Sequence, residues 1–148
     1  MKAITSGLLA GIAGAVAMSA TMALGRRAGL LHQTLAEDSV DWMDRNFDAR
    51  EHLGTTGAYA AEQANHALAG AAFGALYSLL PKTRLPSVVS GLAYGAALYV
   101  VNIGVAAPLL GITRGEHKAP LAQAVERFGL HALFGVVTAY GVDALRKR

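Results

Sequence analysis

The sequence predicts an all-α polytopic membrane protein, with four transmembrane helices arranged as two duplicated hairpins and one short interfacial helix. Two observations carry this prediction: long stretches without charge, and short motifs that occur twice in the same order. Of the 148 residues, 53% are apolar and 16% are charged, whereas about a quarter of a typical soluble domain is charged. We therefore expect the lipid bilayer to be the main partner of this chain.

Four long stretches of the chain contain no Asp, Glu, Lys or Arg. A helix needs about 20 mainly apolar residues to cross the hydrocarbon core, and residues 3–25, 63–81 and 85–113 meet that length. The fourth stretch, 128–142, is shorter and spans if the charged side chains beside it reach the two interfaces. We predict a single domain, 1–148, with transmembrane helices at about 3–25, 58–80, 86–111 and 122–144.

Charged residues at the helix ends predict the orientation. The turn at 81–86 carries Lys82 and Arg84, and the chain ends in Arg146-Lys147-Arg148. Basic residues beside spans favour the cytoplasmic side, which predicts a multi-pass bacterial inner-membrane protein with both termini in the cytoplasm. The net charge of +3 therefore reports orientation, and no nucleic-acid partner is expected. For 3–25, a cleaved signal peptide is the alternative interpretation.

Two motifs recur in the same order along the chain. SGLLAG at 6–11 returns as SGLAYG at 90–95, and HALAG at 66–70 returns as HALFG at 131–135. We interpret residues of about 1–81 and 86–148 as two copies of one hairpin, related by a pseudo-two-fold axis along the membrane normal. Small residues let transmembrane helices approach closely. We expect packing contacts at Gly7, Gly11, Gly70, Gly74, Gly95 and Gly135.

The loop between the first two predicted spans contains a short amphipathic helix. Asp38 or Ser39 is its predicted N-cap, and Gly54 its predicted stop. We expect this helix to lie at the membrane interface, with a substrate lid as the alternative. Its interfacial residues are Val40, Trp42, Met43 and Phe47. In the third span, Pro108 is expected to kink or stop the helix.

Polar side chains lie within or beside the predicted spans, where ionisable groups are costly and often functional. His66 and His131 occupy equivalent positions of the two hairpins, near the same interface. Four interpretations remain open: structural hydrogen bonds, a proton-responsive cluster, a divalent metal site formed with Glu62 and Glu126, and a haem held by both histidines. The predicted cluster comprises Glu62, Asn65, His66, Asn102, Glu126 and His131.

The chain from its second predicted helix onward resembles a known family. The segments AEQANHALAGAAFGALYSLLP, AAPLLGI and HALFGVVTAYGVDALRKR resemble the YagU-like proteins, which are small four-span proteins of bacterial inner membranes with no established molecular function. The resemblance implies an inner-membrane location, cytoplasmic termini and a role in acid tolerance. Family members typically carry an acidic or His-Glu pair before Pro-Leu-Leu-Gly, whereas this chain has Val101-Asn102 at that place.

Together these patterns predict a small integral membrane protein without enzymatic activity. No cysteine is present, which excludes disulfides and cysteine nucleophiles, and no catalytic triad order or phosphate-binding loop is found. We expect a link to acid or pH stress, or service as an accessory subunit of a larger membrane complex, as a homo-oligomer or with other subunits. The alternatives are a His/Glu metal- or haem-binding protein and a small transporter or channel. No cofactor is expected, with haem or a divalent metal as the alternatives.

Overall fold

The computed structural model describes residues 2–31, 34–81 and 84–147, and the part of the chain that it describes is helical, without strands. Two long helices and a short helix between them form the first half of the chain. The second half begins with an α-helix that continues as a π-helical segment. The elements in chain order are α1 (Ala3–Arg27), α2 (Leu35–Phe47), α3 (Ala49–Leu79), α4 (Ser87–Tyr99), the π-helical segment η1 (Val100–Ala106), α5 (Ala107–Leu109), η2 (Glu116–Lys118) and α6 (Leu121–Arg146).

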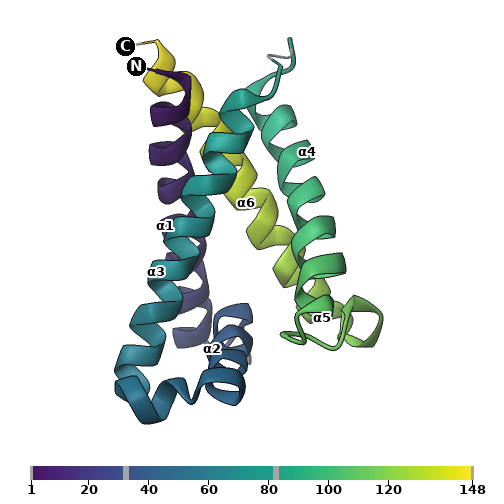
Figure 1. Ribbon diagram of the computed structural model, residues 1–148. Coiled ribbons are helices and arrows are strands. Elements are labelled where there is room, and N and C mark those ends of the chain that lie inside the picture. Colours follow the sequence, from purple (N-terminus) through teal and green to yellow (C-terminus); the bar gives the residue numbers. More distant parts are fainter. Residues whose placement is uncertain (1, 32–33, 82–83, 148) are drawn as a thin grey trace.

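The four long helical segments run side by side in the order α3, α1, α6, α4 (Figure 1). Helix α1 packs on α3 and on α6, and α4 packs on the other side of α6. Both termini lie at one end of the bundle, and α2 lies across the opposite end. The two inter-hairpin contacts are unequal, because α1 lies closely along α6 whereas α3 and α4, the helices equivalent to α6 and α1, meet through side chains such as that of Tyr94.

Three of the described helices, and not the predicted four, are long and apolar enough to span a membrane. They are Ala3–Arg27, Ser87–Leu109 and Leu121–Arg146. Helix α3 is 31 residues long but falls short in composition, because Glu62, Gln63, Asn65 and His66 interrupt its apolar sequence. The apolar helices indicate a bilayer environment.

Each hairpin is held by glycines whose backbones touch. A Cβ built on Gly11 of α1 would lie 2.0 Å from the carbonyl oxygen of Gly70 on α3, and a Cβ on Gly135 of α6 would lie 2.0 Å from that of Gly91 on α4. No side chain fits at such a distance, so only glycine permits this approach. The same holds for the other glycines expected at these contacts, Gly7, Gly74 and Gly95.

The two hairpins differ in register by one helical turn. In the first, Gly11 faces the carbonyl of Gly70, whereas in the second the equivalent Gly95 faces the carbonyl of His131. His131 corresponds to His66 in the repeat, which is four residues before Gly70. A shift of four residues keeps the same helix face in contact, so the glycine-rich surfaces still meet.

Pro108 ends the third long helix after a widened turn. Because proline lacks an N–H and its ring crowds the preceding turn, the helix opens into the π-helical segment Val100–Ala106, and the Ala107 N–H donates to the carbonyl of Asn102. The helix stops at Leu109, and Gly111 follows with φ of 72°. This agrees with the expected stop at the proline and places the end two residues before the predicted position.

Helix α2 begins earlier than predicted, because Thr34 and not Asp38 or Ser39 is its N-cap. The Glu37 N–H donates to the Thr34 hydroxyl, and the Thr34 N–H donates to Glu37 Oε2 at 2.8 Å, which is a capping box. Gly54 does not end α2, which stops at Phe47, but its non-helical backbone with φ of 68° separates the first turn of α3 from the rest of that helix. The apolar side of α2 buries Val40 against Ala49 and Ala58 of α3.

The corner between α2 and α3 is held by Asp44 and Arg50. The Arg50 backbone N–H donates to Asp44 Oδ1 at 2.8 Å, and its guanidinium donates to Oδ2 at 2.9 Å. The backbone hydrogen bond and then the guanidinium hold the pKa of the Asp44 carboxyl below its ordinary value. A carboxyl with a lowered pKa in the folded state stabilises above its unfolded pKa, about 3.9, and this contribution is lost as the pH falls through the folded value.

We therefore expect Asp44→Asn to flatten the pH dependence of stability below about pH 4. Thermal unfolding followed by circular dichroism between pH 5 and pH 2 measures the effect. Asp48→Asn, which removes an exposed carboxyl at the same corner, serves as the control and should leave the profile near that of the parent. Identical profiles for Asp44→Asn and the parent would show that the corner does not depend on this carboxylate.

Candidate functional site

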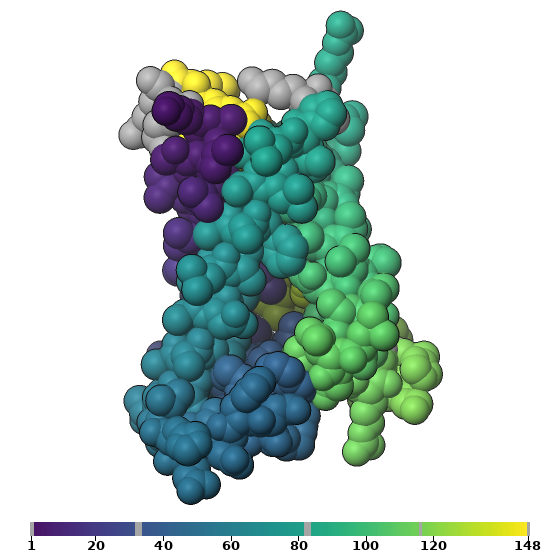
Figure 2. All heavy atoms as spheres, in the orientation of Figure 1, coloured from purple at the N-terminus to yellow at the C-terminus, as the bar shows by residue number. Residues whose placement is uncertain are grey.

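A small cavity lies at the end of the bundle that α2 covers. Its volume is about 120 Å³, and its walls come from α1, α2, α3 and α6. In the space-filling view the molecule is hollowed directly above α2, between α3 and α4 (Figure 2). The lining residues are Met18, Met22, Leu35, Ala36, Ser39, Glu62, Asn65, His66, Ala69, Arg127, Leu130 and His131.

The α3 wall presents three of the predicted polar residues on one face. Glu62, Asn65 and His66 follow the i, i+3, i+4 spacing that places side chains together on a helix, and all three line the cavity. Glu62 is buried, with 6% of its surface exposed, and it accepts a hydrogen bond from Gln63 Nε2 at 2.6 Å. Burying a carboxyl group that accepts one hydrogen bond from an amide lowers the stability of the fold, so Glu62 is the least favourable residue of this wall for folding.

Helix α1 contributes a hydroxyl to the histidine on α3. Ser19 Oγ lies 3.1 Å from His66 Nδ1 and donates to Gln63 Oε1 at 2.7 Å. Ser19 continues the four-residue series of small residues on α1 that begins with Gly7 and Gly11. The same small-residue face that packs the first hairpin therefore also orients the imidazole of His66.

The α6 wall contains a buried ion pair with α2. Arg127 Nη2 donates to Asp38 Oδ2 at 2.9 Å, and the exposed fractions of the two side chains are 6% and 15%. One turn further along α6, His131 is buried, and its Nδ1 lies 2.8 Å from the carbonyl oxygen of Arg127. The ring of Tyr99 meets the imidazole edge to face, with centroids 5.9 Å apart.

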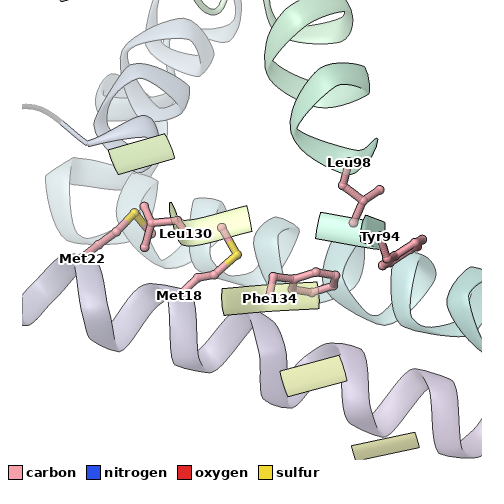
Figure 3. Packing of buried hydrophobic residues seen from close by; sticks show 6 residues of the cluster. All are labelled: Met18, Met22, Tyr94, Leu98, Leu130 and Phe134. Atoms are coloured by element: carbon pink, nitrogen blue, oxygen red, sulfur yellow. The ribbon is translucent and has the colours of Figure 1, made fainter. Parts of the chain in front are cut away.

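Beyond the polar walls the interior is apolar. Met18 and Met22 of α1 meet Leu130 and Phe134 of α6, and Tyr94 and Leu98 of α4 complete the cluster (Figure 3). The hydroxyl of Tyr94 donates to the carbonyl of Phe73 on α3 at 2.6 Å. The polar cavity is thus bounded by packed hydrophobic side chains on the side that faces the middle of the bundle.

Helix α2 closes the cavity by contacts to both hairpins. Trp42 Nε1 donates to the carbonyl of Leu110 at 2.7 Å, which joins α2 to the end of the second hairpin's first helix. Glu37 forms an ion pair with Arg26 at the end of α1. Together with the Arg127–Asp38 pair, these contacts make α2 a bridge across the end of the bundle.

Two of the predicted cluster residues lie elsewhere. Asn102 sits in the π-helical segment and Glu126 lies beside Arg127, and neither is among the residues that line the cavity. Conversely, Arg127 was not among the predicted cluster residues, yet it lines the cavity and pairs with Asp38 of α2. A contact between residues 89 positions apart cannot be predicted from a local sequence pattern. The capping box could have been predicted, because Thr34-x-x-Glu37 is its usual sequence signature.

Two features of the described residues bear on the metal and haem alternatives. Among the residues that the structure describes, no three His, Asp or Glu side chains are grouped so that they could hold a metal ion. Haem is larger than most ligands that occupy pockets of about 300–1,000 Å³, and the cavity between the two histidines has about 120 Å³. A cavity of that size suits a few water molecules, each of which takes about 30 Å³ of liquid volume.

The site is therefore a polar cavity large enough for a few water molecules. It is lined by two imidazoles, a buried ion pair and a buried carboxyl group, and it is closed by the amphipathic helix α2. Comparison of the chain with protein-family models, curated proteins and solved structures found no match.

Proposed function

We propose that this chain is a small, non-enzymatic protein of a bacterial inner membrane whose bundle responds to acidification. One observation carries the proposal: His66 and His131, from different hairpins, line the same small cavity with Arg127. Histidine is the side chain whose ordinary pKa lies between pH 5 and pH 8. The resemblance to YagU-like proteins is consistent with this proposal and remains a prediction.

Protonation of both histidines would gather positive charge in a confined space. The charged or titratable groups that line it or pair across it are Glu62 and His66 of α3, Arg127 and His131 of α6, and Asp38 of α2. At low pH three cations would then face at most two carboxylates, in surroundings where charges interact more strongly than in water. Repulsion between the α3 and α6 walls favours water entry and separation of the hairpins at this end.

The element that reports such a separation is α2, because it contacts both hairpins. Trp42, the single tryptophan of the chain, donates to the carbonyl of Leu110 and should lose that contact when the hairpins move apart. We expect its emission maximum to shift to longer wavelength between pH 8 and pH 5. The combined variant His66→Gln with His131→Gln should abolish the shift.

The matched control is His52→Gln with His117→Gln, which removes two exposed histidines and should keep the shift. Fluorescence titration of the purified protein in nanodiscs makes the comparison. If the parent shows no shift, or if the control variant loses it as fully as the cavity variant, the proposed function is wrong.

The proposal includes a fourth crossing by α3 and cytoplasmic termini. Helix α3 runs beside α1 from Gly74 opposite Gly7 to Gln63 opposite Ser19, so it covers most of the thickness that α1 covers. The ionisable members of its polar stretch are shielded, since Glu62 is buried and His66 is half-buried against α1 and the cavity, whereas Gln63 and Asn65 are exposed beside them. Cysteine variants at exposed positions, labelled from either side of oriented vesicles, test this topology in a chain that has no native cysteine.

A further inference from the structure

A second and larger pocket lies at the opposite end of the bundle, near the termini. It has a volume of about 510 Å³ and lies between the end of α3, the first half of α4 and the end of α6. This volume is within the range of about 300–1,000 Å³ of small-molecule sites. The lining residues are Tyr77, Leu80, Pro81, Leu85, Ser90, Ala93, Tyr94, Ala97, Val142, Asp143 and Arg146.

The polarity of this pocket changes along the helix axis. Its charged residues, Asp143 and Arg146, lie in the last turns of α6, whereas Ala93 and Ala97 of α4 lie toward the middle of the bundle. An amphiphile in a bilayer has the same order, with its head at the interface and its chain toward the centre. The charged end of the pocket therefore corresponds to a lipid headgroup, and its apolar end to the acyl chains of the same lipid.

The charged end offers one group of each sign. Asp143 and Arg146 are three residues apart on α6, which places their side chains on one face of the helix, and both line the pocket. Asp143 Oδ2 accepts a hydrogen bond from Ser87 at 2.5 Å, and Arg146 Nη2 donates to the carbonyl of Ser78. These contacts hold both side chains in place at the mouth of the pocket.

The guanidinium of Arg146 has donors that no described residue uses. Arg146 Nε is buried and has no hydrogen-bond partner among the described residues. A buried donor without a partner is costly, and guanidinium groups bind phosphate oxygens especially well. A phosphate in the pocket would bind the outer N–H groups of the guanidinium while the carbonyl of Ser78 keeps Nη2, and it would reach the covered Nε only after the side chain rotates.

We propose that this pocket binds a zwitterionic aminophospholipid, with the phosphate at Arg146, the ammonium at Asp143 and the start of an acyl chain against Ala93 and Ala97. A carboxylate favours a primary ammonium, which donates hydrogen bonds, over a choline group, which has no N–H. The carboxylate also disfavours a purely anionic headgroup. This proposal is independent of the acid response, because it uses the other end of the bundle.

The test is native mass spectrometry of the detergent-solubilised protein with equal amounts of phosphatidylethanolamine, phosphatidylcholine and phosphatidylglycerol of the same acyl chains. The parent should retain phosphatidylethanolamine about tenfold better than the other two, since a hydrogen bond to a charged group is worth that factor or more. Asp143→Asn should reduce retention of phosphatidylethanolamine to the level of phosphatidylcholine. Arg146→Gln should lower retention of all three phospholipids.

Neighbouring variants separate binding from general effects of charge or size. Lys147→Gln removes one positive charge next to Arg146 but outside the pocket lining and should retain lipid like the parent. Ala97→Phe fills the inner part of the pocket and should lose the bound lipid, whereas Leu92→Phe, at an exposed position of α4 outside the pocket lining, should not. If Arg146→Gln unfolds, Asp143→Asn and Ala97→Phe decide the question.

Equal retention of the three phospholipids by the parent would overturn the proposal. So would a preference for phosphatidylglycerol, which would make the pocket an anion site. A third contrary outcome is that Asp143→Asn and Ala97→Phe bind lipid as the control variants do.

Discussion

Gly11→Ala should destabilise the protein more than any other single methyl addition to α1. The new Cβ would lie 2.0 Å from the carbonyl oxygen of Gly70 and 2.8 Å from the Cα of Gly74. Both are backbone atoms, so no side-chain rotation can relieve the overlap, and the two helices must separate. Overpacking usually costs about 1–3 kcal/mol and sometimes more, and we expect this variant at or above the upper end.

Gly129→Ala is the matched control for the glycine prediction, because a Cβ there would meet nothing within 4 Å. Alanine is the better helix former by up to about 1 kcal/mol in solution, so this variant should be neutral or more stable. Thermal unfolding in detergent, followed by circular dichroism, compares the two. Equal melting temperatures for Gly11→Ala and Gly129→Ala would contradict the close approach of α1 and α3.

Loss of the Arg127–Asp38 ion pair should have an effect of similar size. With the two side chains 6% and 15% exposed, Arg127→Met leaves a largely buried carboxylate without its guanidinium. Removing one partner of a buried pair costs about 3–5 kcal/mol, whereas replacing both with apolar residues often costs little. We therefore expect the double variant Arg127→Met with Asp38→Leu to be more stable than Arg127→Met alone.

The exposed pair of Arg50 and Asp41 provides the comparison. Their side chains are 35% and 42% exposed, so Asp41→Asn should cost no more than about 1 kcal/mol. A double-mutant cycle measured by thermal unfolding gives the coupling energy of each pair. If the coupling energy of Arg127 and Asp38 is no larger than that of Arg50 and Asp41, the buried ion pair does not stabilise the packing of α2 on the bundle.

The parts of the fold that follow from local sequence could be predicted. Uncharged runs located α1, α4 and α6, and the spacing of small residues marked faces such as that of Gly7 and Gly11, which the structure places in backbone contact. The register between helices could not be read in this way. Because small residues recur at every fourth position, a shift of one helical turn preserves the contact between the helices. The two hairpins differ by such a shift.

Long-range contacts explain most of what the sequence did not reveal about the site. His66 and His131 were predicted from their repeated motif, and both line the cavity. Arg127 was predicted at an interface and not as a member of the cluster, which it joins by pairing with Asp38 of α2. The docking of α2 decides this, and it depends on contacts such as that between Trp42 and Leu110, which no local pattern encodes.

The polar face of α3 sets the order in which the chain would enter a membrane. Charged residues make the insertion of a lone helix costly, and α3 carries Glu62 along with His66. In the proposed four-span topology, α3 would therefore partition into lipid as a pair with α1, whose Ser19 contacts the imidazole of His66 on α3. Helix α6 supplies one wall of the cavity and is synthesised last. A chain truncated before Arg127 would therefore leave Glu62 without that wall, and we expect such a chain to be degraded.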